Sequence, residues 1–445
     1  MLRLVISIGV LVALVVIPLT AVGQVETGEA TFIPLGDLPG GQAVSSALGV
    51  AVVDFVPDEA IAAELDDGKA DEGAVLRVAS DDPDHELEAL IVGDSSSAET
   101  GSNAREAFAW TEQEGMIGLG SLKGGSFRSR ARAISDDGKA IVGASSSAFT
   151  GSNAAEAFLL DERGAATLGD LPGGQYRSEA FDVSHRGDYV VGSSSSRGSG
   201  ANSSEAFRWS DKDGMMGLGS LEGGQFRSAA LGISNDGGLV VGWSSSRRSG
   251  ANSSEAFRWS EGGGMLGLGS LAGGQFSSEA RDVSSHGSVI VGASSSARSG
   301  SNATEAFIWN EKSGMAGLGF LPGGFSDSEA NAVTGDGGLV VGRSRTPSLN
   351  DAFIWDDVNG MRSIIEVLES EGLDLEGWRL VSATGVVRAP DAIVVVGTGI
   401  NPREIEEAWA ATLAVPEPSA TAGQLAALLA VAALAGRSAR CRRRT

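Results

Sequence analysis

Cysteine and histidine are nearly missing from this chain of 445 residues. Its single cysteine, Cys441, has no second cysteine to join, so an intrachain disulfide is excluded. The three histidines, His85, His185 and His286, are too few and too scattered to suggest a zinc site. We therefore expect no metal and no cofactor, and a fold that is stable without covalent cross-links.

Basic residues are also scarce. The chain holds 33 lysines and arginines against 57 aspartates and glutamates, a formal net charge of −24. A surface of this charge repels nucleic acid and anionic lipid, so we expect no nucleic-acid partner. The acidity suits solubility outside a cell, and the alternative is a calcium-rich or polyelectrolyte partner.

The motifs of common enzymes are absent as well. The sequence contains no G-x-S-x-G nucleophile elbow, no HExxH metal motif and no phosphate-binding loop. Catalysis needs a nucleophile, a base and an orienting group at one place, and no such set is visible. We predict no catalytic residues and a protein that is not an enzyme.

The amino terminus is the first feature that is clearly present. Residues 1–23 hold one early positive charge, an apolar run and then small residues, which is typical of a secretory signal peptide. Ala21 and Gly23 fit a small-x-small cleavage site, so cleavage is expected between Gly23 and Gln24. The alternative is a permanent anchor helix.

The carboxyl terminus, residues 415–445, holds three features in order: Pro416-Glu417-Pro418, an apolar stretch at 420–436, and an arginine-rich tail. The stretch predicts a short transmembrane helix, with the arginines on the cytoplasmic side. The order closely resembles the PEP-CTERM sorting signal of Gram-negative bacteria. That resemblance implies an exosortase-type processing protease as partner. It also implies brief anchoring in the inner membrane and then release to the cell surface or the extracellular space.

Between the two ends the chain repeats itself with a period near fifty residues. Four phrases recur, of the forms GMxGLGSL, GGQFRSxAxxIS, VVGxSSS and EAFRW. The third and fourth occur seven times each; the glycine of the third is Gly93, Gly143, Gly192, Gly242, Gly292, Gly342 and Gly397. Such a period indicates units that bury their apolar faces only against neighbouring units.

Each phrase is typical of one short strand, and turn signals such as SNDGG separate the phrases. Four strands per repeat predict the blade of a β-propeller, with a β-solenoid as the alternative. The orphan phrase at 31–36 would complete an incomplete last blade at 378–413. We therefore predict an all-β, seven-bladed β-propeller over residues 24–414, closed by pairing of its first strand with the last blade.

The repeated phrases also resemble the HAF repeat of bacterial extracellular proteins, over roughly residues 31–413. Where that repeat has His-Ala-Phe, this chain has Glu-Ala-Phe or Asp-Ala-Phe, as at Glu205 and Asp351. The resemblance implies an exported protein that frequently carries a PEP-CTERM tail, and it implies no established activity. Kelch repeats share the period, but the order of glycines and aromatics fits them less well.

Two segments interrupt the repeat. Residues 51–88 are acidic and separate the first and second strands of the first blade. We expect them to form a solvent-exposed insertion. A partner-docking arm or a loose calcium site is the alternative for this insertion, although the carboxylates lack the order of a tight calcium loop. Residues 362–372 predict a short helix that packs on the ring as a plug or at a rim.

One rim of the predicted propeller receives long Ser/Gly-rich loops and the other only short turns. Functional residues concentrate on loops held by a rigid scaffold. The candidate ligand-binding residues are Gln175, Tyr176, Asn202, Gln225, Arg227, Arg247, Asn252 and Asn302. Their side chains suit hydrogen bonding to polyols, although Tyr176 and Phe226 could instead pack between blades and the loops could be plain connectors.

These features together predict an exported cell-surface or extracellular-matrix protein. Its expected role is to bind exopolysaccharide or matrix proteins through the loop-rich rim, without catalysis. Two alternatives stay open: a polysaccharide hydrolase or lyase with its site in the central channel, and a passive structural component of the matrix.

Overall fold

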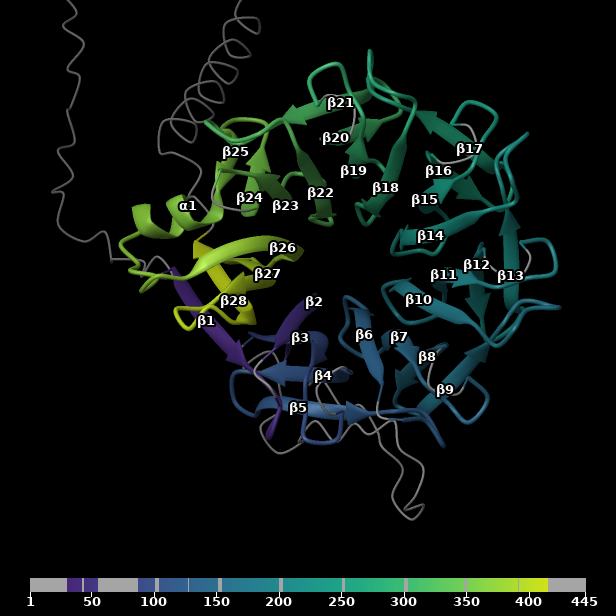
Figure 1. Cartoon of the computed structure of the whole chain (residues 1–445), viewed down its shortest axis with the longest axis horizontal. Coiled ribbons are helices and arrows are strands. Elements are labelled where there is room, and N and C mark those ends of the chain that lie inside the picture. Colours follow the sequence, from purple (N-terminus) through teal and green to yellow (C-terminus); the bar gives the residue numbers. More distant parts are fainter. Residues whose placement is uncertain are drawn as a thin grey trace, which may run out of the picture.

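The computed structural model describes eleven stretches of the chain: residues 30–41, 44–54, 87–100, 104–126, 128–150, 154–199, 203–249, 253–299, 303–347, 350–390 and 392–414. They form seven antiparallel sheets of four strands, arranged as blades around a central axis (Figure 1). The predicted seven-bladed β-propeller is therefore confirmed. The predicted signal peptide, the Pro-Glu-Pro motif and the apolar stretch at 420–436 lie outside the described residues. Within these stretches, no helix is long and apolar enough to cross a membrane.

The blades follow one another in chain order. Blade one is β2 (Ser45–Asp54), β3 (Leu87–Ser95), β4 (Glu106–Thr111) and β5 (Gly115–Gly120), and blade two is β6 (Ser129–Ile134), β7 (Ile141–Ser145), β8 (Glu156–Asp161) and β9 (Gly164–Gly169). Blade three is β10 (Ser178–Val183), β11 (Val190–Ser194), β12 (Glu205–Ser210) and β13 (Gly214–Gly219), and blade four is β14 (Ser228–Ile233), β15 (Val240–Ser244), β16 (Glu255–Ser260) and β17 (Gly264–Gly269). Blade five is β18 (Ser278–Val283), β19 (Ile290–Ser294), β20 (Glu305–Asn310) and β21 (Gly314–Gly319), and blade six is β22 (Ser328–Val333), β23 (Val340–Arg345), β24 (Asn350–Asp356) and β25 (Gly360–Ser363). Blade seven is β26 (Arg379–Arg388), β27 (Ala392–Ile400), β28 (Glu406–Ala414) and β1 (Thr31–Gly36).

The position of a strand within its blade decides how much of it is buried. The second strands, such as β15, are covered on both faces, which agrees with their continuous β-branched runs. The third strands are also buried on both faces at their start, as at Ala256 and Phe257 of β16. The third strands alternate small and large side chains, as in EAFRWS of β16, and this alternation reflects the space available on each face. It does not mark a face open to solvent.

The hydrophobic core lies between the blades. One cluster joins Val191, Ala206 and Leu218 of blade three to Ile233 and Phe257 of blade four. The same pattern of a third-strand phenylalanine against the preceding blade recurs around the ring. Each repeat thus completes its core on its neighbour, as expected of a repeat architecture.

The two ends of the described chain close the ring. Strand β1 pairs antiparallel with β28, with Thr31 opposite Thr412 and Pro34 opposite Trp409. Phe32 of β1 meets the edge of Trp378, with 5.3 Å between the ring centroids. The predicted closure is therefore confirmed, and every blade has four strands.

The two interruptions are shorter than the sequence suggests. Strand β2 continues through Asp54 and β3 begins at Leu87, so the blade-one ladder takes up the first and last residues of the predicted insertion 51–88. The rest of the insertion, residues 55–86, lies outside the described part. Helix α1 (Ile364–Ser370) falls within the predicted range 362–372, whose first two residues end β25.

Helix α1 is not a plug in the centre of the ring. It lies at the outer margin of the propeller, beside β25 and β26 (Figure 1). Ile364 and Leu368 are fully buried there, in the cluster that contains Trp378 and Trp409. The helix therefore covers the core next to the closing blade.

Candidate functional site

The propeller has two unlike rims. The looped rim carries the loops from second to third strands and the links from one blade to the next. Backbone hydrogen bonds join these segments in pairs, as from Arg197 N–H to the Pro172 carbonyl (3.2 Å) and from Arg247 N–H to the Glu222 carbonyl (3.3 Å). The opposite rim, here called the turn rim, carries the turns inside each blade, which are short in the described stretches. Residues 55–86 of blade one, between β2 and β3, lie outside those stretches. This arrangement agrees with the asymmetry predicted from loop length.

Five of the predicted binding residues can be placed, and all five lie on the looped rim. Gln175 and Tyr176 are in the link between blades three and two, Gln225 and Arg227 are in the next link, and Arg247 is in the loop after β15. Asn202, Asn252 and Asn302 lie outside the described residues, as do Gly23, Gln24, Pro416, Glu417 and Pro418. The structure brings the five residues to one rim, in two neighbouring links and the loop after β15 rather than in a single cluster.

Tyr176 is held in an unusual backbone conformation, with φ of 49°. The Asp170 carboxylate accepts its backbone N–H at 2.9 Å, which supports a conformation that few residues other than glycine adopt. Its ring stacks on Phe149 from the loop of the preceding blade, with centroids 5.6 Å apart and planes 17° from parallel. The predicted packing between blades is therefore present, and it leaves both rings open to solvent.

Exposed aromatic side chains gather on the looped rim. Four exposed aromatic residues of the described stretches lie there: Phe149 (71 % exposed), Tyr176 (52 %), Phe226 (39 %) and Phe325 (53 %). Three of them have an arginine or an aromatic beside them, because the Arg345 guanidinium lies 5.3 Å from the centroid of Phe325 and Phe149 stacks on Tyr176. Phe149, Phe226 and Phe325 were not among the predicted binding residues, although the sequence places each inside a rim loop or link.

The repeated glutamates of the third strands serve the fold. The Glu106 carboxylate accepts the N–H of Gly120 at 3.0 Å, and the Glu205 carboxylate accepts the N–H of Gly219 at 3.1 Å. A side chain at Gly217 would collide with the Glu205 carboxylate, so this glycine leaves room for the carboxylate in blade three. These two carboxylates therefore hold the outer strand against the third strand.

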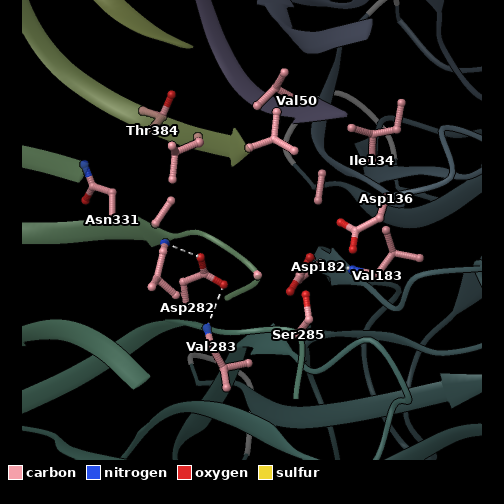
Figure 2. A pocket seen from close by; sticks show the side chains of 18 of the residues that line it. Val50, Ile134, Asp136, Asp182, Val183, Asp282, Val283, Ser285, Asn331 and Thr384 are labelled. Atoms are coloured by element: carbon pink, nitrogen blue, oxygen red, sulfur yellow. Dashed lines mark hydrogen bonds between the residues drawn. The ribbon is translucent and has the colours of Figure 1, made fainter. Parts of the chain in front are cut away.

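A central cavity of about 770 Å³ lies where the inner strands approach the turn rim. It receives residues from all seven inner strands, and Figure 2 shows Asp136, Asp182 and Asp282 directing their carboxylates into it. Asp182 and Asp282 occupy one repeat position. The other blades have Gly49, Ala133, Gly232, Ala332 and Gly385 there.

Asp182 and Asp282 were not among the site residues predicted from the sequence. The only signal was a charged residue at a position that is otherwise Gly or Ala, and its place in the channel follows from the ring. Each carboxylate joins two blades. Asp182 accepts the N–H groups of Val183 and of Ile233 in blade four, and Asp282 accepts those of Val283 and of Val333 in blade six, at 2.7–2.8 Å.

Burial raises the pKa of both carboxyl groups. Each side chain keeps some surface open to the cavity, but protein surrounds it on the other sides and disfavours the charged form. Burial raises the pKa of Asp282 to about 6, against the backbone hydrogen bonds that lower it. Burial also raises the pKa of Asp182 well above its usual range, and the negative charge of Asp282 adds to the effect.

These shifts predict a pH dependence of stability. Because the folded-state pKa of Asp282 is about 6, above its ordinary value of 3.8, its protonated form stabilises the fold below that ordinary value. This contribution is lost as the pH rises through about 6. The variant Asp282→Ala lacks this contribution. As the pH rises from 4 to 7, its free energy of unfolding should therefore increase relative to that of wild type, by up to about 3 kcal/mol. Urea denaturation across this pH range measures the difference.

Asp236 provides a control of opposite sign. The Ser234 hydroxyl and the Gly238 N–H hold the pKa of its carboxyl below the usual range. The stabilising contribution of this carboxyl group is therefore present above its ordinary pKa and is lost as the pH falls. The free energy of unfolding of Asp236→Ala should therefore not increase relative to that of wild type as the pH rises toward 7. Equal pH profiles for the Asp282→Ala variant and wild type would contradict the burial argument.

The described residues contain no group of three or more His, Cys, Asp or Glu side chains that could hold a metal ion. No protein-family model and no curated protein matches the chain. Among solved structures, Sqt1 of Chaetomium thermophilum is similar at 9 % identity and a TM-score of 0.39, over 87 % of this chain and 98 % of that one. The periplasmic gluconolactonase PpgL of Pseudomonas aeruginosa is similar at 13 % identity and a TM-score of 0.35, over 72 % of this chain and 94 % of that one.

Proposed function

We propose that this chain is an exported, non-enzymatic binding protein that attaches to extracellular polysaccharide through its looped rim. The observation that carries the proposal is the gathering of Phe149, Tyr176, Phe226 and Phe325 on that rim, exposed to solvent. Aromatic faces offer large, rigid contact areas to the apolar faces of sugar rings. Exposed aromatics collected at one end of a soluble protein mark a surface that is covered in use.

The proposal extends to the ends of the chain. In it, residues 1–23 direct export, and an exosortase-type protease acts at Pro416-Glu417-Pro418 after a brief stay in the inner membrane. The mature propeller then resides at the cell surface or in the extracellular matrix, where matrix proteins are further possible partners. The net charge of −24 supports this setting and speaks against nucleic acid as a ligand.

A test removes the stacked pair. The double variant Phe149→Ala/Tyr176→Ala should bind the producer's extracellular polysaccharide about tenfold more weakly, because anchoring aromatics dominate such contacts. Both side chains are exposed, so the free energy of unfolding should change by no more than about 1 kcal/mol. Affinity chromatography or calorimetry with the purified polysaccharide measures the effect.

The matched control is Val358→Ala. Val358 is a solvent-exposed apolar residue on the turn rim, 84 % exposed, and its loss should leave binding unchanged. Equal binding by wild type and the aromatic double variant would reject the looped rim as the binding surface. Absence of any binding by folded wild-type protein would favour a passive structural role in the matrix.

The central cavity supports a second candidate, a polysaccharide hydrolase or lyase. The specific observation is that Asp182 and Asp282, two carboxyl groups with raised pKa, face one cavity. Against it, both oxygens of each carboxylate already accept backbone N–H groups. If the chain cleaves polysaccharide and Asp282→Ala abolishes the cleavage, this candidate replaces the binding proposal.

A further inference from the structure

A second cavity on the looped rim has a chemical character that the chain as a whole does not share. It has a volume of about 520 Å³, which lies in the range of small-ligand sites, about 300–1,000 Å³. Three arginines line it: Arg128, Arg177 and Arg227. Three guanidinium groups around one cavity are unexpected in a protein with a net charge of −24.

The three arginines occupy the same repeat position in blades two, three and four. Each directly precedes the first serine of an inner strand, and each carbonyl accepts an N–H from a serine of its own blade: Ser146 at 2.7 Å, Ser195 at 2.8 Å and Ser245 at 2.8 Å. Their backbones are therefore fixed by the blades, and the side chains extend from rigid points. Such pre-organisation lowers the entropic cost of binding.

The fold does not require arginine at this position. In three of the other blades the carbonyl of the equivalent residue accepts the same kind of bond, and the residue is Val44 in blade one, Ser277 in blade five and Asp327 in blade six. Blades with valine, serine or aspartate there form the same four strands. The formation of a blade therefore does not explain why three consecutive blades have arginine there.

The remaining groups of the cavity favour an anionic ligand. Its one lining carboxylate within the described stretches, Glu179, is neutralised by Arg132, whose Nε donates at 2.7 Å. Arg177 is exposed and has no ion pair with any described residue. The Arg227 guanidinium lies 5.1 Å from the centroid of Trp243, which restrains its position. The hydroxyl of Ser203, another lining residue, has no hydrogen-bond partner among the described residues.

From these observations we infer that the cavity between Arg128, Arg177 and Arg227 binds the negatively charged substituents, carboxylate or sulfate, of an acidic polysaccharide. Guanidinium groups pair with such oxyanions in bidentate fashion, which adds direction to charge. The inference rests on the proposed function and specifies its ligand class. Tyr176 directly precedes Arg177, so one link presents both an aromatic face and a positive charge to the polymer.

The test uses the full chain and three polymers: alginate for carboxylate, dextran sulfate for sulfate, and neutral dextran. The double variant Arg177→Ser/Arg227→Ser carries the residue that blade five has at this position, so it is expected to fold. It should bind the acidic polymers about tenfold more weakly, and the salt dependence of binding should become shallower. The control, Arg186→Ser, removes an exposed arginine from the turn rim and should change nothing.

Each outcome has a meaning. Preference for alginate or dextran sulfate over neutral dextran, lost in the double variant, supports the inference, and the preferred polymer identifies the anion. Equal affinity of the double variant and wild type overturns it, as does equal binding of neutral and acidic polymers. If binding then still depends on Phe149 and Tyr176, the proposed function stands without the anionic site. If no polysaccharide binds and the aromatic variants have no effect, both fail.

Discussion

A chain that lacks residues 31–36 is expected to lose about 5 kcal/mol or more of folding free energy, because the ring can no longer close. Strand β1 is the fourth strand of blade seven, and without it β28 is left with an unpaired edge. Leu35 of β1 is buried, and Phe32 packs against Trp378. Urea denaturation followed by tryptophan fluorescence measures the loss, and light scattering reports association through the exposed edge.

A circular permutant separates closure from chain length. Thr31 lies opposite Thr412, so a short glycine linker from residue 414 to residue 30 would turn β28 and β1 into a hairpin. New ends can be placed at Gly262, in the exposed turn between β16 and β17. This permutant should be about as stable as wild type. A deletion variant as stable as the permutant would mean that β1 contributes little to the ring.

Ring closure is also the feature that the sequence predicts best. A count of phrases leaves one orphan strand at 31–36 and an incomplete blade at 378–413, and only a closed ring joins the two. The prediction succeeds because the repeat fixes the strand order within a blade, and because each blade completes its core on the next. Little local detail is needed for this conclusion.

The candidate sites could be predicted only in part. Loop length alone indicated which rim carries the loops, and Gln175, Tyr176, Gln225, Arg227 and Arg247 do lie there. The convergence of the three arginines, by contrast, depends on how neighbouring blades are placed around the axis.

The channel aspartates show a second limit. Asp182 and Asp282 are one hundred residues apart in the chain, and only the circular arrangement brings both to the central cavity. Such residues are hard to recognise in a repeat sequence, because the recurring positions dominate the pattern. The informative positions are the departures from the repeat, where a charge replaces glycine or alanine.

The glycine of the VVG phrase, in contrast, recurs in all seven blades for a steric reason. In each blade it pairs with an inner-strand alanine at a bulge, as Gly242 pairs with Ala230. The bulge brings the preceding carbonyl oxygen over the glycine. A side chain at any of the seven glycines would collide with that oxygen: Gly93 with Ser46, Gly143 with Arg130, Gly192 with Glu179, Gly242 with Ala229, Gly292 with Glu279, Gly342 with Glu329 and Gly397 with Ser382.

We therefore expect Gly242→Ala to destabilise the protein by at least about 3 kcal/mol. The new methyl group would meet the Ala229 carbonyl and would lie 2.9 Å from the Ala230 Cα. Both contacts are with backbone, which cannot move without breaking the ladder between β14 and β15. Thermal and urea denaturation measure the cost.

The matched control is Gly262→Ala, in the turn after β16. No atom lies within 4 Å of a methyl group placed there, so the stability should change by less than about 1 kcal/mol. A small effect at Gly242 as well would mean that the bulge can relax. The recurrence of glycine would then reflect descent of the repeats from one unit, and the collision would not be what keeps it in every blade.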